Sequence, residues 1–381
     1  MLFSLLGMAQ GGSSSQHYFY TGANEHIIQY HAGGTAGSTV EDVTAAAGAP
    51  LAASVSGGLT SYSLPGDAEH VYFIGSNLHV NELVCCWSVN DVSAAAGSPY
   101  PTSTGALTSF VDSAGEHVFY LGANQNVYQL WYSYGSSEWF LQDLTTSSGG
   151  PLAAAGSHLT SFADSFGEHI VYMGTNEHVY QIYYNSSHGN WVDQDLTATT
   201  SGVSAASGSA LSSFADNSGE HVIYIGADLH IFQFYYPASG TGWIDQDLNG
   251  LASNNPGPAA SGSGLTSFSD PSDYYYGPGG EHVFYVSSGL QVSELLFTGS
   301  VWQGFPNLPG NMPVAQGSLA LTSLPGYDNG TTPDFEQFAY IGPVNYLTIM
   351  QFTPGSFWFF PCSDCEGQPS PMSSLTSFLD R

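Results

Sequence analysis

The apolar and polar positions of this chain recur in a unit of about 53 residues, which indicates a repeat protein. Each unit opens with Leu-Thr-Ser-Phe or a close variant, and the spacings between openings are 48, 52, 52, 54, 56 and 54 residues. The opening residues are Leu59, Leu107, Leu159, Leu211, Leu265, Leu321 and Leu375. We name each unit by its opening leucine.

The Leu159 unit contains four short runs rich in Val, Ile, Tyr and Phe, separated by Gly, Asn and Asp. The runs cover residues 159–162, 168–174, 178–184 and 191–197. This pattern predicts four antiparallel strands joined by tight turns. No convincing helical periodicity interrupts it. Four-stranded units repeated around an axis are the blades of a β-propeller.

The two ends of the chain together make one more unit. Residues 12–58 contain the second, third and fourth runs, whereas residues 375–381 contain only a first run. We therefore expect the C-terminal strand to pair with the N-terminal strands, because closing the ring removes the exposed edges of an open array. The sequence predicts an all-β fold, a single seven-bladed β-propeller over residues 12–381, preceded by an apolar arm at residues 1–11.

The charge of the chain restricts the classes of molecule that it can bind. It has 31 acidic residues, and Arg381 is its only Lys or Arg, so the formal net charge is −30. Nucleic acids and anionic membranes are poor partners for such a chain, because both require basic side chains. P-loop, Schiff-base and sialidase-type chemistry are excluded for lack of lysine or an arginine cluster. No run of about 18 apolar residues is present, so membrane insertion is not expected.

A polar pair and a tryptophan recur in the units. A His opens the second run, a Gln or Glu follows twelve residues later, and a Trp starts the fourth run. Such a set suits a sugar, because hydroxyls take polar contacts while the apolar face of the ring stacks on an aromatic. The alternative is structural, with His and Gln linking strands and Trp filling the core between blades. The candidate glycan-binding residues are His70, Glu82, His117, Gln129, Trp139, His169, Gln181, Trp191, His221, Gln233, Trp243, His282 and Glu294.

This arrangement resembles the fungal-type fucose-specific lectins, which are β-propellers. The resemblance implies sugar pockets between blades, each built from an Arg, a Glu and an aromatic residue. The Arg of that family is replaced here by a histidine, at His70, His117, His169, His221 and their equivalents. Its Glu is kept at Glu82 and Glu294 and is Gln elsewhere. The typical ring of the family has six blades, whereas seven are predicted here.

Other chemistry is thinly represented. A second histidine recurs after the Asn or Asp of the second turn, but each copy is isolated in sequence, so no metal site is expected. The turn residues Asp112, Asp164 and Asp216 do not form calcium loops, and turn capping explains them. No unique pair of carboxylates breaks the repeat, although catalytic sites usually need such asymmetry. We expect a non-enzymatic protein without a cofactor.

Two functions are compatible with these features. The first is a multivalent glycan-binding propeller outside the cell, in which several weak pockets gain avidity. The second is a structural subunit of an extracellular filament, formed by head-to-tail contact between copies of the chain. The residues expected to join copies are Leu2, Phe3, Leu5, Leu6, Tyr274, Tyr275, Tyr276, Cys85, Cys86, Cys362 and Cys365.

The cysteines and the N-terminus bear on the compartment. The adjacent pair Cys85 and Cys86 has the wrong spacing for a four-cysteine zinc site. A disulfide within Cys362–Cys365, or between chains, is favoured instead. The arm lacks the basic segment of a secretory signal, so the route of export stays open. An extracellular location is expected, because scarce Lys and Arg deny trypsin-like proteases their cleavage sites.

Overall fold

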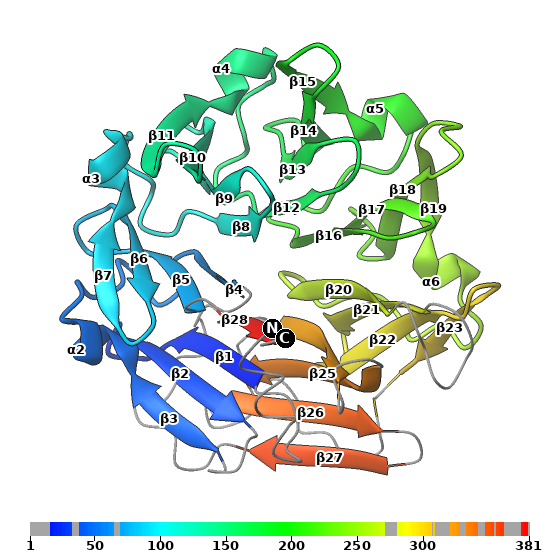
Figure 1. Ribbon diagram of the computed structural model, residues 1–381. Coiled ribbons are helices and arrows are strands. Elements are labelled where there is room, and N and C mark those ends of the chain that lie inside the picture. Colours follow the sequence, from blue (N-terminus) through cyan, green and yellow to red (C-terminus); the bar gives the residue numbers. More distant parts are fainter. Residues whose placement is uncertain are drawn as a thin grey trace.

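The strands form seven antiparallel sheets of four strands each, counted over the residues that the computed structural model describes. These are residues 16–32, 38–64, 69–270, 280–306, 308, 321–327, 333–341, 347–353, 356–361 and 375–379. Figure 1 shows the sheets as blades of a ring, with β8, β12 and β16 near the centre and β11, β15 and β19 outside. The predicted seven-bladed propeller is confirmed.

The strands of each blade follow one another across the sheet. The composite blade contains β28 (Leu375–Leu379), β1 (Gln16–Thr21), β2 (Ile27–Ala32) and β3 (Thr39–Asp42). The Leu59 blade contains β4 (Leu59–Ser63), β5 (Glu69–Ile74), β6 (Val80–Val84) and β7 (Ser88–Asp91). The Leu107 blade contains β8 (Leu107–Val111), β9 (Gly115–Leu121), β10 (Val127–Ser133) and β11 (Glu138–Asp143). The Leu159 blade contains β12 (Leu159–Ala163), β13 (Glu168–Met173), β14 (Val179–Asn185) and β15 (Asn190–Asp195).

The other three blades have the same order. The Leu211 blade contains β16 (Leu211–Ala215), β17 (Gly219–Ile225), β18 (Ile231–Pro237) and β19 (Ile244–Asp247). The Leu265 blade contains β20 (Leu265–Asp270), β21 (Gly280–Val286), β22 (Val292–Phe297) and β23 (Trp302–Phe305). The Leu321 blade contains β24 (Leu321–Tyr327), β25 (Pro333–Ile341), β26 (Leu347–Thr353) and β27 (Ser356–Pro361).

The composite blade joins the two ends of the chain. Strand β28 pairs antiparallel with β1, with Leu375 opposite Tyr20 and Ser377 opposite Tyr18. Tyr18 and Tyr20 also pack with Ala339 and Leu347, which belong to the Leu321 blade. The first and last strands therefore share one sheet, and that sheet packs on the blade that precedes it in the ring.

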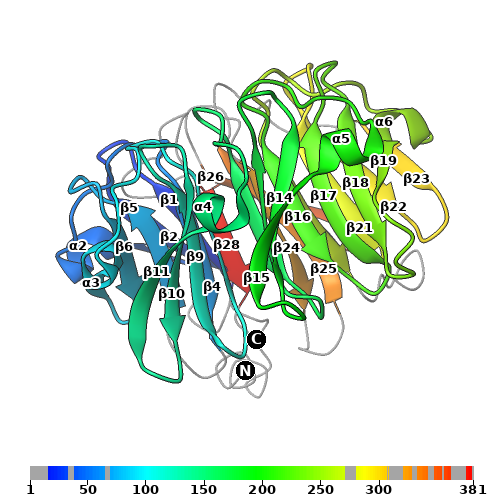
Figure 2. The ribbon, with the colours of Figure 1, turned by 90° about the horizontal axis from the view of Figure 1, so that it is seen from above.

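The core lies between blades. The second strand of a blade, such as β9 or β17, is buried along its whole length. Figure 2 shows why, because the sheets of neighbouring blades stand face to face. Phe119 and Leu121 of the Leu107 blade, for example, pack in one cluster with Ile170 and Tyr172 of the Leu159 blade. Side chains on both faces of a central strand are therefore apolar, and only its first residues are polar.

Short helices follow the fourth strand in five blades, and the sequence analysis missed them. Its fourth run of residues 191–197 was expected to be strand throughout, but the strand ends at Asp195 and a helix begins at Leu196. A helix of one turn is too short to produce a periodic pattern. None of the described helices is long and apolar enough to cross a membrane. The helices are α2 (Val43–Ala47), α3 (Val92–Ala96), α4 (Leu144–Ser148), α5 (Leu196–Thr200) and α6 (Leu248–Leu251).

Candidate functional site

The histidine and the residue twelve positions later are in contact in every blade where both are described. In the Leu107 blade, Gln129 Nε2 donates to His117 Nδ1 at 2.8 Å. Across the six described pairs this distance is 2.6–2.9 Å. The two residues lie on adjacent strands of one sheet, so the pairing predicted from the spacing is present.

A glutamate from the next blade joins five of the six described pairs, and the sequence pattern did not single it out. Glu168 of the Leu159 blade accepts from Gln129 Nε2 at 2.8 Å, and it lies 3.2 Å from His117 Nδ1. The glutamate directly precedes the histidine of its own blade, so the dipeptide Glu-His was the available signal. Neighbouring residues of a strand face opposite sides. Glu168 therefore reaches back one blade while His169 reaches forward, to within 3.5 Å of Glu220.

These contacts are buried. Only 1% of His117 and 3% of Gln129 is exposed, and His169, Gln181 and His221 are equally enclosed. Around most of the ring the polar pair therefore links neighbouring blades, which is the structural alternative given above. A bound sugar would have to displace these hydrogen bonds to reach the His and Gln side chains.

The tryptophans face the preceding blade. Trp139 begins the outer strand of the Leu107 blade, yet it packs edge-on against Tyr72 of the Leu59 blade, with ring centroids 6.3 Å apart. The sequence groups Trp139 with His117, whereas the structure places it beside His70 and Glu82. Trp191 and Trp302 are 5% and 6% exposed and belong to the core, so they present no free aromatic face.

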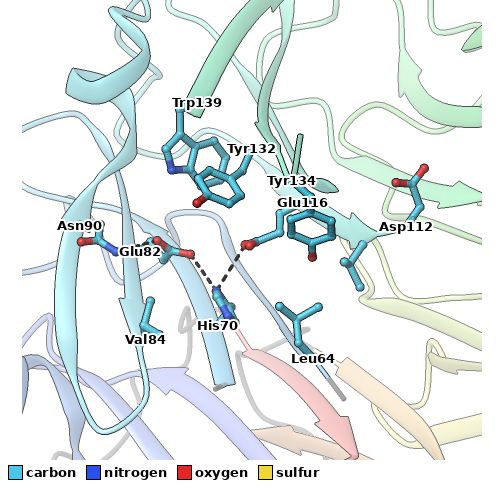
Figure 3. A pocket seen from close by; sticks show the side chains of 11 residues that line it. Leu64, His70, Glu82, Val84, Asn90, Asp112, Glu116, Tyr132, Tyr134 and Trp139 are labelled. Atoms are coloured by element: carbon cyan, nitrogen blue, oxygen red, sulfur yellow. Dashed lines mark hydrogen bonds and ion pairs between the residues drawn. The ribbon is translucent and has the colours of Figure 1, made fainter. Parts of the chain in front are cut away.

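A cavity of about 800 Å³ lies between the Leu59 and Leu107 blades. His70, Glu82 and Asn90 line it from one blade, and Glu116 and Asp112 line it from the other. Figure 3 shows the aromatic residues Tyr132, Tyr134 and Trp139 grouped on the side of the Leu107 blade. The cavity thus combines an aromatic wall with several carboxylates.

Four residues in contact with His70 or with Glu82 differ from those of the Leu107 blade. Opposite the histidine, the Leu59 blade has Tyr62 where the next blade has Phe110. Similarly, Tyr72 replaces Phe119, Glu82 replaces Gln129 and Asn90 replaces Gln142. Glu82 and Glu116 both contact His70, at 2.8 and 3.4 Å. Two carboxylates therefore meet at one histidine here, a pairing that the sequence pattern did not bring together. The pattern missed this pairing because the two residues belong to different blades.

The tyrosine hydroxyls bind both carboxylates. Tyr72 donates to Glu82 Oε1 at 2.6 Å, and Tyr62 donates to Glu116 Oε2 at 2.5 Å. Burial on its own would raise the pKa of Glu82, but hydrogen bonds from His70, Tyr72 and Asn90 outweigh it and lower that pKa. Burial, together with the nearby carboxylates, raises the pKa of Tyr62 and of Tyr72. Glu82 is therefore ionised and the tyrosines stay neutral at ordinary pH.

The second set of histidines has a structural partner. His178 Nδ1 lies 2.8 Å from Asp195 Oδ2, and Asp195 Oδ1 accepts from the Ala198 amide at the start of α5. The equivalent pairs link His26, His79 and His230 to Asp42, Asp91 and Asp247. The first-turn aspartates cap their turns as expected, since Asp164 accepts from the amides of Phe166 and Gly167.

A second cavity of about 520 Å³ lies between the first turns of the Leu159 and Leu211 blades. Asp164, Phe166, Asp216 and Glu220 line it, and none of the candidate glycan-binding residues does. Phe166 is 60% exposed there.

Of the residues expected to join copies, Cys85 and Cys86 lie among the described ones. Both are free thiols, with their Sγ atoms 3.3 Å apart, and Cys86 is exposed. The rest of that set lies outside the described residues, namely Leu2, Phe3, Leu5, Leu6, Tyr274, Tyr275, Tyr276, Cys362 and Cys365. The assembly hypothesis therefore stays a prediction.

Comparison with known proteins finds similarity of structure. No model of a known protein family and no curated protein matches the sequence. The BP39L lectin from Burkholderia pseudomallei superposes with a TM-score of 0.60 at 12% identity, over 91% of this chain and 94% of that one. AofleA from Arthrobotrys oligospora gives 0.53 at 14% identity, over 84% and 88% of the two chains.

The Aleuria aurantia lectin, described as a six-bladed β-propeller with a novel mode of fucose recognition, gives 0.51 at 14% identity. The match covers 80% of this chain and 95% of that lectin. The resemblance to fucose-specific lectin propellers is thus present in the structure, and at this identity it establishes the fold. The chain described here has one blade more than the Aleuria lectin.

Proposed function

We propose that this protein is a non-enzymatic glycan-binding propeller and that the cavity between the Leu59 and Leu107 blades is its binding site. The observation that supports the proposal best is the composition of that cavity. Trp139, Tyr132 and Tyr134 supply apolar faces for a sugar ring, and Asp112 and Asn90 supply polar groups for its hydroxyls. Structural similarity to lectins adds weight, since an Aleuria aurantia lectin variant is known in complex with α-methyl-L-fucoside.

The proposal differs from the multivalent ring expected from the sequence. The buried state of Trp191 and Trp302 leaves no aromatic face for a sugar at their two blade interfaces. At the first of these interfaces Gln129 binds Glu168, and at the second His221 contacts Gln233 and Glu281. We therefore assign binding to one principal cavity, with affinity from one site rather than from avidity. Glycoconjugates outside the cell are the proposed partners, and the protein is proposed to act there.

A glycan array with the purified protein, followed by titration calorimetry with the best ligand, tests the proposal. Trp139→Ala should reduce affinity about fivefold or more, because stacking of a sugar ring on an aromatic ring contributes on the order of 1 kcal/mol. Phe166→Ala removes an exposed aromatic from the second cavity and should leave affinity unchanged. Absence of any glycan ligand would contradict the function. Equal binding by the Trp139 variant would contradict the site.

A further inference from the structure

The cluster around His70 has the geometry of a metal site. Both carboxylates approach the same ring nitrogen, with Glu82 Oε1 at 2.8 Å and Glu116 Oε2 at 3.4 Å from His70 Nδ1. All three atoms lie within 4.8 Å of one another. Ligand atoms of a tetrahedral zinc ion, each about 2.0–2.1 Å from the metal, are separated by about 3.3 Å. Figure 3 shows the two contacts converging on His70 at the cavity.

The cluster contains more short polar contacts than it has hydrogen atoms available to form hydrogen bonds. Six such contacts join His70 Nδ1, the two carboxylate oxygens and the hydroxyls of Tyr62 and Tyr72. Two hydroxyls and one ring N–H supply at most three hydrogens. The two hydroxyl oxygens lie 2.9 Å apart, and the Tyr72 oxygen lies 2.9 Å from Glu116 Oε2. A cation bound by the carboxylates would satisfy the oxygen lone pairs that these hydrogens leave without a donor.

Three other groups of a histidine and two carboxylates lack this convergence. In the Leu107 blade, Asp112 contacts His117 at Nε2, whereas Glu168 lies nearest to Nδ1. The same holds around His169 and His221. The ligand atoms of these groups also lie within 4.8 Å of one another, but one ion can take only one nitrogen of a ring, and only one carboxylate in each group approaches each nitrogen. These groups match the structural role assigned above.

The departures from the repeat supply an independent argument. Packing between blades is satisfied elsewhere by Phe110, Phe119 and Gln129 at the same positions, so packing alone does not require Tyr62, Tyr72 and Glu82. A Gln-to-Glu change adds an ionisable ligand, and the two Phe-to-Tyr changes add donors to the ligand oxygens. Hydrogen bonds to ligating carboxylates are typical of metal sites.

We propose that His70, Glu82 and Glu116 bind one divalent transition-metal ion of the zinc class, with Tyr62, Tyr72 and Asn90 orienting the carboxylates. A ligand set of one imidazole and two carboxylates suits zinc and the neighbouring transition metals, whereas calcium takes six to eight oxygen ligands. These three ligands line the cavity, so a fourth position would open toward it. This assignment departs from the expectation of no metal, and it does not depend on the proposed glycan function.

Calorimetric titration of the full-length, chelator-treated protein with Zn²⁺, in excess Ca²⁺ to occupy the acidic surface, tests the proposal. We expect one saturable site per chain. Glu82→Gln should weaken zinc binding at least about 100-fold, and it restores a residue that other blades carry, so the fold should persist. Tyr62→Phe, also a return to the repeat, should weaken binding about tenfold through loss of an orienting hydrogen bond.

The matched control is Glu168→Gln, which changes the equivalent of Glu116 one blade further on and should leave zinc affinity unchanged. Co²⁺ gives a second readout, because a bound four-coordinate ion absorbs visible light and the Glu82 variant should lose that band. A titration without a saturable site would overturn the proposal, as would unchanged binding by Glu82→Gln. No sugar enters these experiments, so their failure is separable from failure of the glycan function.

Discussion

Glu116 directly precedes His117 in the chain, but the two side chains serve different blade interfaces. The Glu116 carboxylate lies 3.4 Å from His70 of the preceding blade, whereas His117 Nδ1 lies 3.2 Å from Glu168 of the following blade. Strand alternation produces this division, because successive side chains leave opposite faces of the sheet. One Glu-His dipeptide therefore ties each of the Leu59, Leu107, Leu159 and Leu211 blades to both neighbours. This explains why the pair recurs whether or not a sugar binds.

The first prediction concerns the stability of such a contact. Gln129→Leu would leave Glu168 and His117 without their shared partner in a buried interface. Glu168 and His117 keep their 3.2 Å contact with each other, so the loss is that of the Gln129 hydrogen bonds, about 1.5–3 kcal/mol for a bond to a charged group. We expect urea denaturation to show a loss of that size relative to the parent protein. Ser136→Ala, at an exposed turn, is the control and should change little.

A pH dependence follows from His221. Burial alone would lower the pKa of His221, but Asp216 and Glu281 outweigh it and raise the pKa to about 9. A folded-state pKa above the ordinary value of 6.5 means that protonation stabilises the fold. This contribution is complete below pH 6.5 and is lost as the pH rises through about 9.

Thermal melts at pH 6.5 and 9 measure this loss. The melting temperature of the parent protein should be lower at pH 9 than at pH 6.5, and this decrease should be smaller for His221→Gln. The same raised direction for the pKa of His117 predicts an additive effect in a double variant. Parallel falls in parent and variant would show that His221 is not the responsible group.

The Thr and Ser of the Leu-Thr-Ser-Phe motif contact each other across neighbouring blades, a role that one unit of the sequence does not reveal. Thr160 Oγ1 lies 2.8 Å from Ser213 Oγ on the inner strand of the next blade. Equivalent hydroxyl pairs join five successive blade interfaces among the described residues. The second residue of each motif therefore contacts the following blade and the third residue contacts the preceding blade, so that these contacts form a chain along the inner strands.

Substitution of that threonine tests its contribution. Thr160→Val keeps the shape and β propensity of the side chain but removes its hydroxyl, so Ser213 loses its partner. A side-chain hydrogen bond contributes about 0.5–1.5 kcal/mol net. We expect a destabilisation in that range in urea denaturation. Thr160→Ser, which keeps the hydroxyl, should recover most of it. Equal losses in the two variants would show that the hydroxyl alone does not account for the contribution of Thr160.

The sequence determined the fold to the level of strands and blade count because each blade repeats the same alternation. It also placed His117 beside Gln129, since a hairpin register turns their spacing into a contact. It could not place Trp139 beside His70, because no local pattern encodes which blade an outer-strand side chain faces. Tyr62 and Tyr72 looked like ordinary strand aromatics, and only their shared approach to Glu116 reveals a cluster.

The last prediction concerns Cys85 and Cys86, the described members of the set expected to join copies. Burial, a hydrogen bond with Cys86 and the nearby Glu69 and Glu41 raise the pKa of Cys85 to about 12. The thiolate is the reactive form of cysteine, so Cys85 should be almost unreactive at pH 8. Cys86 is exposed and should react first.

Timed alkylation with iodoacetamide, followed by peptide mass spectrometry, distinguishes the two thiols. We expect label at Cys86 well before Cys85, and Cys86→Ser should abolish the fast phase. If copies are joined covalently through this turn, non-reducing electrophoresis of oxidised protein should show dimers that the Cys86 variant lacks and that Cys85→Ser retains. Preferential labelling of Cys85 would contradict the electrostatic argument, because burial and three neighbours, Cys86, Glu69 and Glu41, would then fail to suppress its thiolate.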